Sequence, residues 1–307
     1  MARVRRAARL ARRAVRVPDA LAGLQAQLGD LQSRAVAGLA PHELERAEFQ
    51  VYSQFGEDGI IQFLVQRVPV ENRVFVELGV EDYSESNTRF LLVHDAWRGL
   101  IVDAGDAHKQ FLDESRLGWR TTVDAVTAFV DRDNVNAIVR STGIEGPIGL
   151  LSIDVDGNDY WLLEAIDAVA PRILVAEYNS VFGPERAVTV PYDREFVRGE
   201  KHWSHLYWGA SLAALARAAD AKGLALVGGN RAGNNAFFVA RESLGEIPAR
   251  TVAECWQPAQ FRESRGRDGA LTYLSDDREK LRLLRDLPLV DLDAGGEERT
   301  VGELYAV

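Results

Sequence analysis

Acidic side chains follow short apolar runs at several places in the 307-residue chain, and this pattern indicates where its chemistry lies. Val74 to Val76 leads to Glu77, and Leu100 to Val102 leads to Asp103. Because the carboxyl ends of parallel strands meet at one edge of an open sheet, where ligands bind, these acids are expected to surround one site. The same placement is predicted for three further acids, Asp124, Asp154 and Glu177.

The central unit of the predicted sheet is residues 72–104, which read as strand, polar loop, helix and strand. Gly79 follows the first strand and permits a tight turn there. Asp103 follows the second strand, where its carboxylate suits the two hydroxyls of a ribose. A nucleoside-containing cofactor is therefore the first functional expectation.

Apolar runs alternate with helix-like segments along the chain, which predicts an α/β fold with a doubly wound, mostly parallel sheet. The last two runs, 223–227 and 236–240, are too close for a crossover, so they form a hairpin and the final strand is antiparallel. The other strands are predicted at 74–78, 99–103, 119–123, 148–155 and 173–176, and the helices at 60–65, 87–94, 107–117, 134–141, 160–169, 209–221 and 277–287.

Three regions follow from these elements. Residues 1–46 form an N-terminal helical arm, residues 47–240 a Rossmann-like domain, and residues 241–307 a C-terminal extension that caps it. Within the domain, residues 180–208 are an aromatic-rich connection with no predicted secondary structure. Connections of that length inside a compact domain are usually lids or binding loops, so this segment is expected to fold over the acidic edge of the sheet.

Charge is distributed unevenly along the chain. Residues 1–46 hold nine arginines and four acids, which leaves −15 for the rest of a chain whose net charge is −10. Such an acidic body argues against a nucleic-acid substrate. Because Cys255 is the single cysteine, an intramolecular disulfide is excluded, and a reducing, cytoplasmic location is expected.

The arm contains two distinct patterns. Residues 1–17 interleave seven arginines with Ala, Val and Leu, which favours either a basic helix on an anionic surface, such as the inner membrane face, or a solvated arm. Apolar residues then recur at three- and four-residue spacing over about two heptads. They either pair with a second subunit, which predicts a homo-oligomer, or pack on the chain's own body: Leu21, Leu24, Leu28, Leu31 and Ala35.

Four segments between residues 50 and 240 resemble those of class I S-adenosylmethionine-dependent methyltransferases, and within that class the FkbM-like group. They read Y-S-Q-F-G-E-D-G-I-I, F-V-E-L-G-V-E-D-Y-S-E-S-N-T, L-L-S-I-D-V-D-G-N-D and N-A-F-F-V. A parallel sheet whose last strand returns antiparallel is the arrangement of that class. The first methyltransferase motif normally reads acid-x-Gly-x-Gly. Glu77 and Gly79 match it, whereas Glu81 replaces the second glycine.

The resemblance implies S-adenosylmethionine as cofactor and methyl transfer to an oxygen or nitrogen of a sugar, a glycoconjugate or another small polar metabolite. Asp103 matches the acid that holds the ribose, Asp124 falls near the adenine, and the Asp154 segment matches the motif at the mouth of the active site. The full set of candidate cofactor residues is Ser53, Gln54, Glu77, Gly79, Asn87, Asp103, Asp124 and Asp154. For Ser53 the alternative is a cap on the helix that follows it.

The resemblance also raises a magnesium site, since some methyltransferases of small hydroxylated compounds bind Mg²⁺ after the fourth and fifth strands. Asp154 or Asp156, together with Glu177 and Asn179, would supply the hard oxygen ligands that Mg²⁺ prefers. The alternative is that polar residues within 156–159 cap the following helix, while Asp154 meets the cofactor's ammonium group.

Three residues are candidates for the base that removes the acceptor's proton: His202, His205 and Asp156. A histidine suits the task because it titrates near neutral pH. Two other function classes stay open. One is a metal-dependent oxygenase on a related fold, whose two-histidine, one-carboxylate site would use His202 and His205. The other is a non-catalytic nucleotide-binding or scaffold protein.

Overall fold

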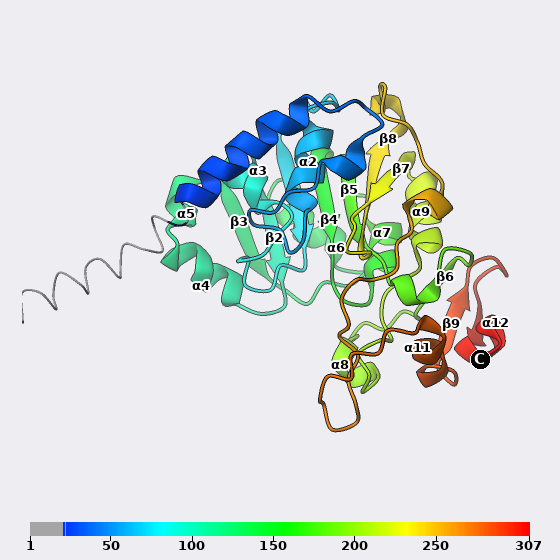
Figure 1. The fold of residues 1–307 in the computed structure, drawn as a ribbon. Helices are drawn as coiled ribbons and strands as arrows, with labels where there is room; N and C mark the ends of the chain where they lie inside the picture. Colours follow the sequence, from blue (N-terminus) through cyan, green and yellow to red (C-terminus); the bar gives the residue numbers. More distant parts are fainter. Residues whose placement is uncertain (1–20, 22) are drawn as a thin grey trace, which may run out of the picture.

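The computed structural model of the chain describes residue 21 and residues 23–307, so the expected basic helix of residues 1–17 lies outside the described residues. The described part is built on a seven-stranded sheet (Figure 1). Its order is β3-β2-β1-β4-β5-β8-β7. The strands are β1 (Val74–Leu78), β2 (Arg98–Asp103), β3 (Val123–Thr127), β4 (Gly146–Ile153), β5 (Val169–Glu177), β7 (Leu224–Gly229) and β8 (Asn235–Ala240).

The direction of the strands confirms the predicted fold class. Strands β1 to β5 pair in parallel, whereas β8 lies antiparallel to both β5 and β7. The predicted hairpin is therefore present, and its second strand inserts between β5 and β7. The result is a mainly parallel sheet in which β8 is the one antiparallel strand.

Helices cover both faces of the sheet, as a doubly wound fold requires. Val74, Val76 and Leu78 of β1 belong to the hydrophobic core under α6, α7 and α9, while Phe75 belongs to the core under α2, α3 and α4. This alternation is the two-residue period of a strand. The helices are α2 (Glu57–Val65), α3 (Arg89–Val93), α4 (Ala107–Glu114), α6 (Val135–Ser141), α7 (Asp159–Ala165) and α9 (Leu212–Ala221).

The third predicted strand is wrong in its bounds. The structure has a short helix α5 (Leu117–Arg120) where residues 119–123 were expected to be extended, and β3 begins only at Val123. The predicted helix 107–117 is interrupted because Arg116 adopts a left-handed conformation, with φ of 59°. Asp124 consequently lies opposite Leu100 near the start of β3 and not at its carboxyl end.

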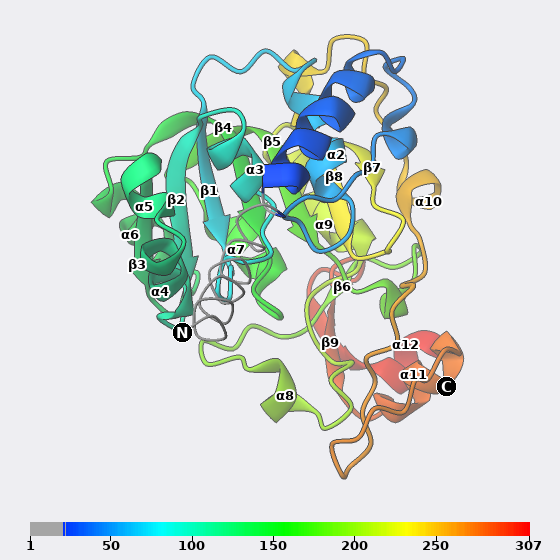
Figure 2. The same ribbon diagram turned by 60° about the vertical axis from the view of Figure 1, so that its left-hand side comes forward.

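The connection 180–208 is more ordered than the sequence suggested. It contains η2 (Ser180–Phe182), β6 (Val188–Thr189) and α8 (Arg198–Lys201). Strand β6 joins a small antiparallel sheet with two strands of the C-terminal extension, β9 (Pro288–Asp291) and β10 (Glu297–Thr300) (Figure 2). The connection and the extension therefore share one hydrophobic core, which also includes residues of α11 (Asp277–Leu283) and α12 (Val301–Tyr305).

Two further short elements complete the extension, η3 (Arg241–Ser243) and α10 (Val252–Cys255). At the other end, a helix over residues 23–37 and η1 (Leu44–Arg46) precede the sheet. A search of the described helices finds none with the length and apolar character that crossing a bilayer demands.

Substitution of Gly79 tests how closely the turn after β1 packs against the end of β4. Its φ is +81°, and a Cβ there would lie 1.6 Å from the carbonyl oxygen of Asp154. We expect Gly79→Ala to lower the free energy of unfolding by about 3 kcal/mol, because it combines backbone strain with a clash that only strand separation relieves. The measurement is equilibrium denaturation in urea.

Gly143→Ala is the matched control, since Gly143 has a φ of +74° but an added Cβ would meet no atom within 4 Å. It should cost only the strain, about 1 kcal/mol. Equal losses in the two variants would show that β1 and β4 do not constrain this turn.

Candidate functional site

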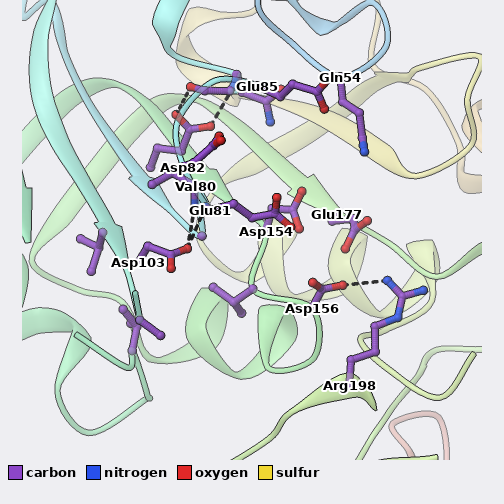
Figure 3. Close-up of a pocket in the computed structure, with 18 of the residues that line it drawn as sticks. Gln54, Val80, Glu81, Asp82, Glu85, Asp103, Asp154, Asp156, Glu177 and Arg198 are labelled. Carbon is purple, nitrogen blue, oxygen red and sulfur yellow. Dashed lines mark hydrogen bonds and ion pairs between the residues drawn. The ribbon is translucent and has the colours of Figure 1, made fainter. Parts of the chain in front are cut away.

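A cavity of about 620 Å³ opens beyond the carboxyl ends of β1, β2, β4 and β5 (Figure 3). Its position is the one predicted for a ligand site in an open parallel sheet. Among the described residues that line it, Arg198 is the only basic one. The lining carboxylates belong to Glu77, Glu81, Asp82, Glu85, Asp103, Asp154, Asp156, Glu177 and Glu263. The cavity therefore favours cations and neutral polar ligands over anions.

Glu77 uses its carboxylate to hold the wall of the cavity together. It accepts hydrogen bonds from Ser86 Oγ at 2.6 Å and from the backbone N–H of Asn87 at 2.8 Å, and it also accepts from Thr88. These donors precede α3, so the carboxylate fixes the start of that helix. Burial raises the pKa of Glu77. Its side chain lines the cavity, but most of its hydrogen-bonding capacity is already used.

Asp103 is tied to the loop that follows β1. Its Oδ2 accepts hydrogen bonds from the N–H groups of Val80 at 3.1 Å and Glu81 at 2.8 Å, and its Oδ1 accepts one from Gly105 at 2.9 Å. An ionised carboxylate offers about four acceptor positions, so about one remains for a ligand hydroxyl. The expectation of two ribose hydroxyls on Asp103 therefore requires one of these backbone bonds to be shared or released.

Glu81 adopts a backbone conformation that favours glycine, the residue expected at this position. Its φ is +46°, in the left-handed region that a non-glycine residue adopts only at a cost. The N–H of Glu81 points at Asp103, and this hydrogen bond helps to hold the strained turn. Glu81 therefore holds a left-handed turn at this position without a glycine.

Three carboxylates converge at the ends of β4 and β5. Oxygens of Asp154, Asp159 and Glu177 all lie within 4.8 Å of one another. Because Ile153 pairs with Ala176, Asp154 just after β4 and Glu177 at the end of β5 are neighbours. Figure 3 shows the carboxylates of Asp154 and Glu177 facing the same part of the cavity.

The electrostatics of this cluster are unfavourable without a counter-charge. Burial, and then the neighbouring carboxylates, raise the pKa of Asp154 and of Glu177 well above the usual range. Burial also raises the pKa of Asp159 to about 6, although its oxygens accept hydrogen bonds from the N–H groups of Val155 and Gly157. The Oε2 atom of Glu177 is buried and has no hydrogen-bond partner within the described residues. A proton or a cation fits this place.

Arg198 joins three segments at the mouth of the cavity. Its guanidinium donates to Asp156 Oδ1 at 2.8 Å and contacts Glu263 of the C-terminal extension. It also donates to the carbonyl oxygen of His205 and lies 4.5 Å from the centre of the Trp208 ring. Asp156 is thereby directed toward Arg198 rather than toward the acidic cluster, as Figure 3 shows.

The segment Y-S-Q-F-G-E-D-G serves mainly to shape the backbone beside the cavity. Asp58 Oδ2 accepts hydrogen bonds from three successive N–H groups, those of residues 51–53. The Oε2 atom of Glu57 accepts from Phe55 and Gly56. This folding presents Gln54 and Phe55 to the cavity, and Phe55 stacks on Phe261 with ring centres 5.7 Å apart.

The structure brings most of the predicted site residues together. The ones that line the cavity are Gln54, Glu77, Gly79, Asn87, Asp103, Asp154, Asp156 and Glu177. Ser53, Asp124, His202 and His205 are not among the residues of its wall. Asp124 lies outside the wall because β3 begins later in the chain than predicted. Residues 128–130, which follow β3, line the cavity instead.

Asn179 also lies apart from the acids with which it was grouped. Its Oδ1 accepts from the N–H of Val181, and its Nδ2 donates to the carbonyl oxygens of Leu206 and Trp208. Asp159 stands in the acidic cluster, although the sequence suggested only a helix cap for it. Arg198, Phe261 and Glu263 were missed because no motif marks them.

No protein-family model matches the sequence, and no curated protein matches it. Among solved structures, the chain is similar to the N-terminal domain of EvdMO1 with SAH bound. The sequence identity is 16% and the TM-score 0.41, over 72% of this chain and 96% of that one. It is also similar to an O-methyltransferase family protein from Burkholderia thailandensis. There the identity is 14% and the TM-score 0.36, over 74% of this chain and 60% of that one.

A third similar structure is the CurJ carbon methyltransferase. The identity is 14% and the TM-score 0.38, over 60% of this chain and 52% of that one. The chain thus spans just over half the length of this structure.

The raised carboxylate pKa values predict a pH-dependent response to Mg²⁺. Acids with raised pKa values contribute stability that is present at low pH and lost as pH rises through the folded-state pKa. In EDTA, the melting temperature should therefore fall between pH 5.5 and pH 8. Millimolar Mg²⁺ should restore it at pH 8 and have little effect at pH 5.5, because only the ionised carboxylates bind the cation. Thermal melts with and without Mg²⁺ measure this.

Glu177→Gln should abolish the Mg²⁺ effect at pH 8. Glu85→Gln is the matched control, because Glu85 lines the same cavity outside the acidic cluster. An Mg²⁺ effect that is equal at both pH values, or that survives in Glu177→Gln, would contradict a cation at this cluster.

Proposed function

We propose that the chain is an S-adenosylmethionine-dependent methyltransferase of the FkbM-like group, acting on an oxygen or nitrogen of a sugar, a glycoconjugate or a small polar metabolite. The observation that carries the proposal is the position of Asp103. It ends the second strand of a sheet ordered β3-β2-β1-β4-β5-β8-β7 and is bound by the loop after β1, at the wall of a 620 Å³ cavity. That is where this sheet arrangement would present an acid to a ribose.

The cofactor would occupy the side of the cavity formed by β1 and β2. Asp103 would accept a ribose hydroxyl, and residues 128–130 after β3 would lie against the adenine in the place predicted for Asp124. Gln54 and Asn87 line the same cavity and can meet the methionine end of the cofactor. An acidic wall suits a cofactor that carries a sulfonium and an ammonium group.

The acceptor would occupy the side formed by β4, β5 and the two later segments. Phe196 from the connection and Phe261 from the C-terminal extension line this cavity together with the acids. Aromatic rings offer flat apolar faces to a sugar ring, and carboxylates accept hydrogen bonds from its hydroxyls. The excess of carboxylates disfavours a phosphorylated or otherwise anionic acceptor.

Methyl transfer requires an in-line approach of the acceptor atom to the sulfonium methyl carbon. The new bond forms between that atom and carbon while the carbon–sulfur bond breaks, which leaves S-adenosylhomocysteine, and the acceptor's proton must go to a base. Asp156 is the one of the three predicted bases that lines the cavity, and Arg198 fixes its position. We therefore assign the proton to Asp156 or to water that it orients.

Asp154 and Glu177, with Asp159 beside them, would hold a divalent cation. The unpartnered Oε2 of Glu177 and the hard oxygen donors of the cluster fit Mg²⁺. When bound, such an ion lowers the pKa of a coordinated hydroxyl and neutralises the carboxylates. The competing use of the cluster, in which Asp154 binds the cofactor's ammonium group, predicts cofactor binding that does not respond to EDTA.

The two other function classes have less support. An oxygenase site needs histidine ligands, and the acidic cluster found among the described residues contains none. A non-catalytic role would leave the acids at the β4 and β5 ends without a task. Turnover separates this role from the enzyme: formation of S-adenosylhomocysteine in the presence of hydroxylated acceptors supports the methyltransferase.

Cofactor binding gives the most selective mutational test. Asp103→Ala should weaken the binding of S-adenosylmethionine about 10- to 100-fold, since it removes a hydrogen bond between a carboxylate and a ribose hydroxyl and loosens the loop after β1. Asp124→Ala is the matched control, because Asp124 lies outside the cavity wall and should leave the affinity unchanged. Isothermal titration calorimetry measures both. Loss of affinity only in Asp124→Ala would show that Asp103 does not bind the ribose. If the unmodified chain does not bind S-adenosylmethionine, the proposed methyltransferase function is rejected.

A further inference from the structure

The helix over residues 23–37 exposes a row of leucines that nothing in the described structure covers. Leu24, Leu28 and Leu31 on this helix, and Leu21 just before it, are 56–60% exposed. They are consecutive apolar positions on one side of the helix, which lies on the outside of the molecule (Figure 1). Scattered exposed leucines are ordinary, but a continuous row is typical of an interaction surface.

The opposite side of the helix attaches it to the body. A Cβ on Gly29 would meet the Phe90 ring at 2.6 Å and Val51 at 2.8 Å, so the helix approaches the body closely there. Ser33 Oγ donates to Gln62 Oε1 at 2.7 Å. Arg67 donates to carbonyl oxygens at the end of the helix, including that of Leu39. The leucines take no part in this attachment and stay exposed to solvent.

The spacing of the leucines is that of a coiled-coil seam. They are separated by three, four and three residues, and Ala35 follows four residues later. An amphipathic helix that only covers its own core has a wider apolar stripe. The residues that flank the seam are Gln25, Gln27, Gln32 and Arg34.

We propose that this leucine face, Leu21, Leu24, Leu28 and Leu31, pairs with the same face of a second copy of the chain. An isologous dimer needs a self-complementary surface. A leucine row with three neutral glutamines and one arginine beside it meets that need, because two copies bring almost no like charges together. Two heptads are short for an isolated coiled coil, but this helix is already formed and anchored by the body, so pairing does not bear the cost of folding it.

None of the four leucines lines the cavity. Figures 1 and 2 both place the helix at the top of the molecule and α8, which carries Arg198, at the bottom. The pairing is thus independent of the reaction proposed above. Among the described residues, Arg34 is the one basic residue that flanks the leucines, and its ion pair with Asp30 at 2.8 Å makes a lipid surface the less favoured occupant of this face.

The test is the mass of the full chain in solution, measured by size-exclusion chromatography with light scattering at about 50 μM. We expect twice the chain mass. The double variant L24Q/L28Q should run as a monomer with an unchanged circular dichroism spectrum, since glutamine preserves the helix and these leucines are not attached to the body. Its melting temperature should fall modestly, because the folded state loses the stabilisation that pairing provides. L271Q is the control: Leu271 is 42% exposed elsewhere, and this variant should remain a dimer.

Leu28→Cys provides a second readout that does not depend on destabilising the dimer. Oxidation should join two copies through this position if the helices pair in parallel, and a mixture of Leu24→Cys and Leu28→Cys chains should cross-link if they are antiparallel. The unmodified chain, whose single cysteine Cys255 is buried, should not cross-link and serves as the negative control.

Three outcomes would overturn the proposal. The first is a monomer at 50 μM that gives no cross-link at either position. The second is a dimer that persists in L24Q/L28Q. The third is a monomer that sediments with phosphatidylglycerol vesicles, but not with phosphatidylcholine vesicles, in a way that L24Q/L28Q abolishes. That last result would assign the leucine face to an anionic lipid surface.

Discussion

The close approach of the Asp154 and Glu177 carboxylates is the constraint on which the rest of the site depends. Parallel pairing of β4 with β5 places both acids at one edge of the sheet, and burial prevents water from screening them. Two ionised carboxylates in such a place repel each other and lack solvation, so at neutral pH they need a proton or a cation. The fold keeps them there, which indicates a role that outweighs their cost in stability.

Several neighbouring residues hold the backbone around these two carboxylates in place. Gly79 allows the turn after β1 to press against the backbone of Asp154, and Glu77 fixes the loop on the other side of the cavity. Arg198 forms ion pairs with Asp156 and Glu263 at the mouth and brings the connection and the C-terminal extension to the site. The extension is therefore part of the cavity wall and not only a cover for the sheet.

Much of the fold and the centre of the site could be predicted from the sequence, because both depend on short apolar patterns and on the residues directly beside them. Asp103 and Glu177 end buried strands and Asp154 follows one, and the apolar pattern sets where each strand ends. Asp124 was misplaced because β3 is an edge strand with a weak pattern, and Trp119 looked like part of it. Arg198 and Glu263 could not be found in this way, since their contacts join residues 42 and 65 positions apart.

The proposed cofactor and cation sites can both be observed in a crystal structure of the chain with S-adenosylhomocysteine and Mn²⁺. Manganese replaces magnesium in this experiment because its anomalous scattering identifies the ion. We expect the ribose against Asp103 and one anomalous peak about 2.1 Å from oxygens of Asp154 and Glu177. An empty cavity with the ligand elsewhere would contradict the methyltransferase site. A cofactor in place, with its ammonium group between these two carboxylates and no anomalous peak, would contradict the cation.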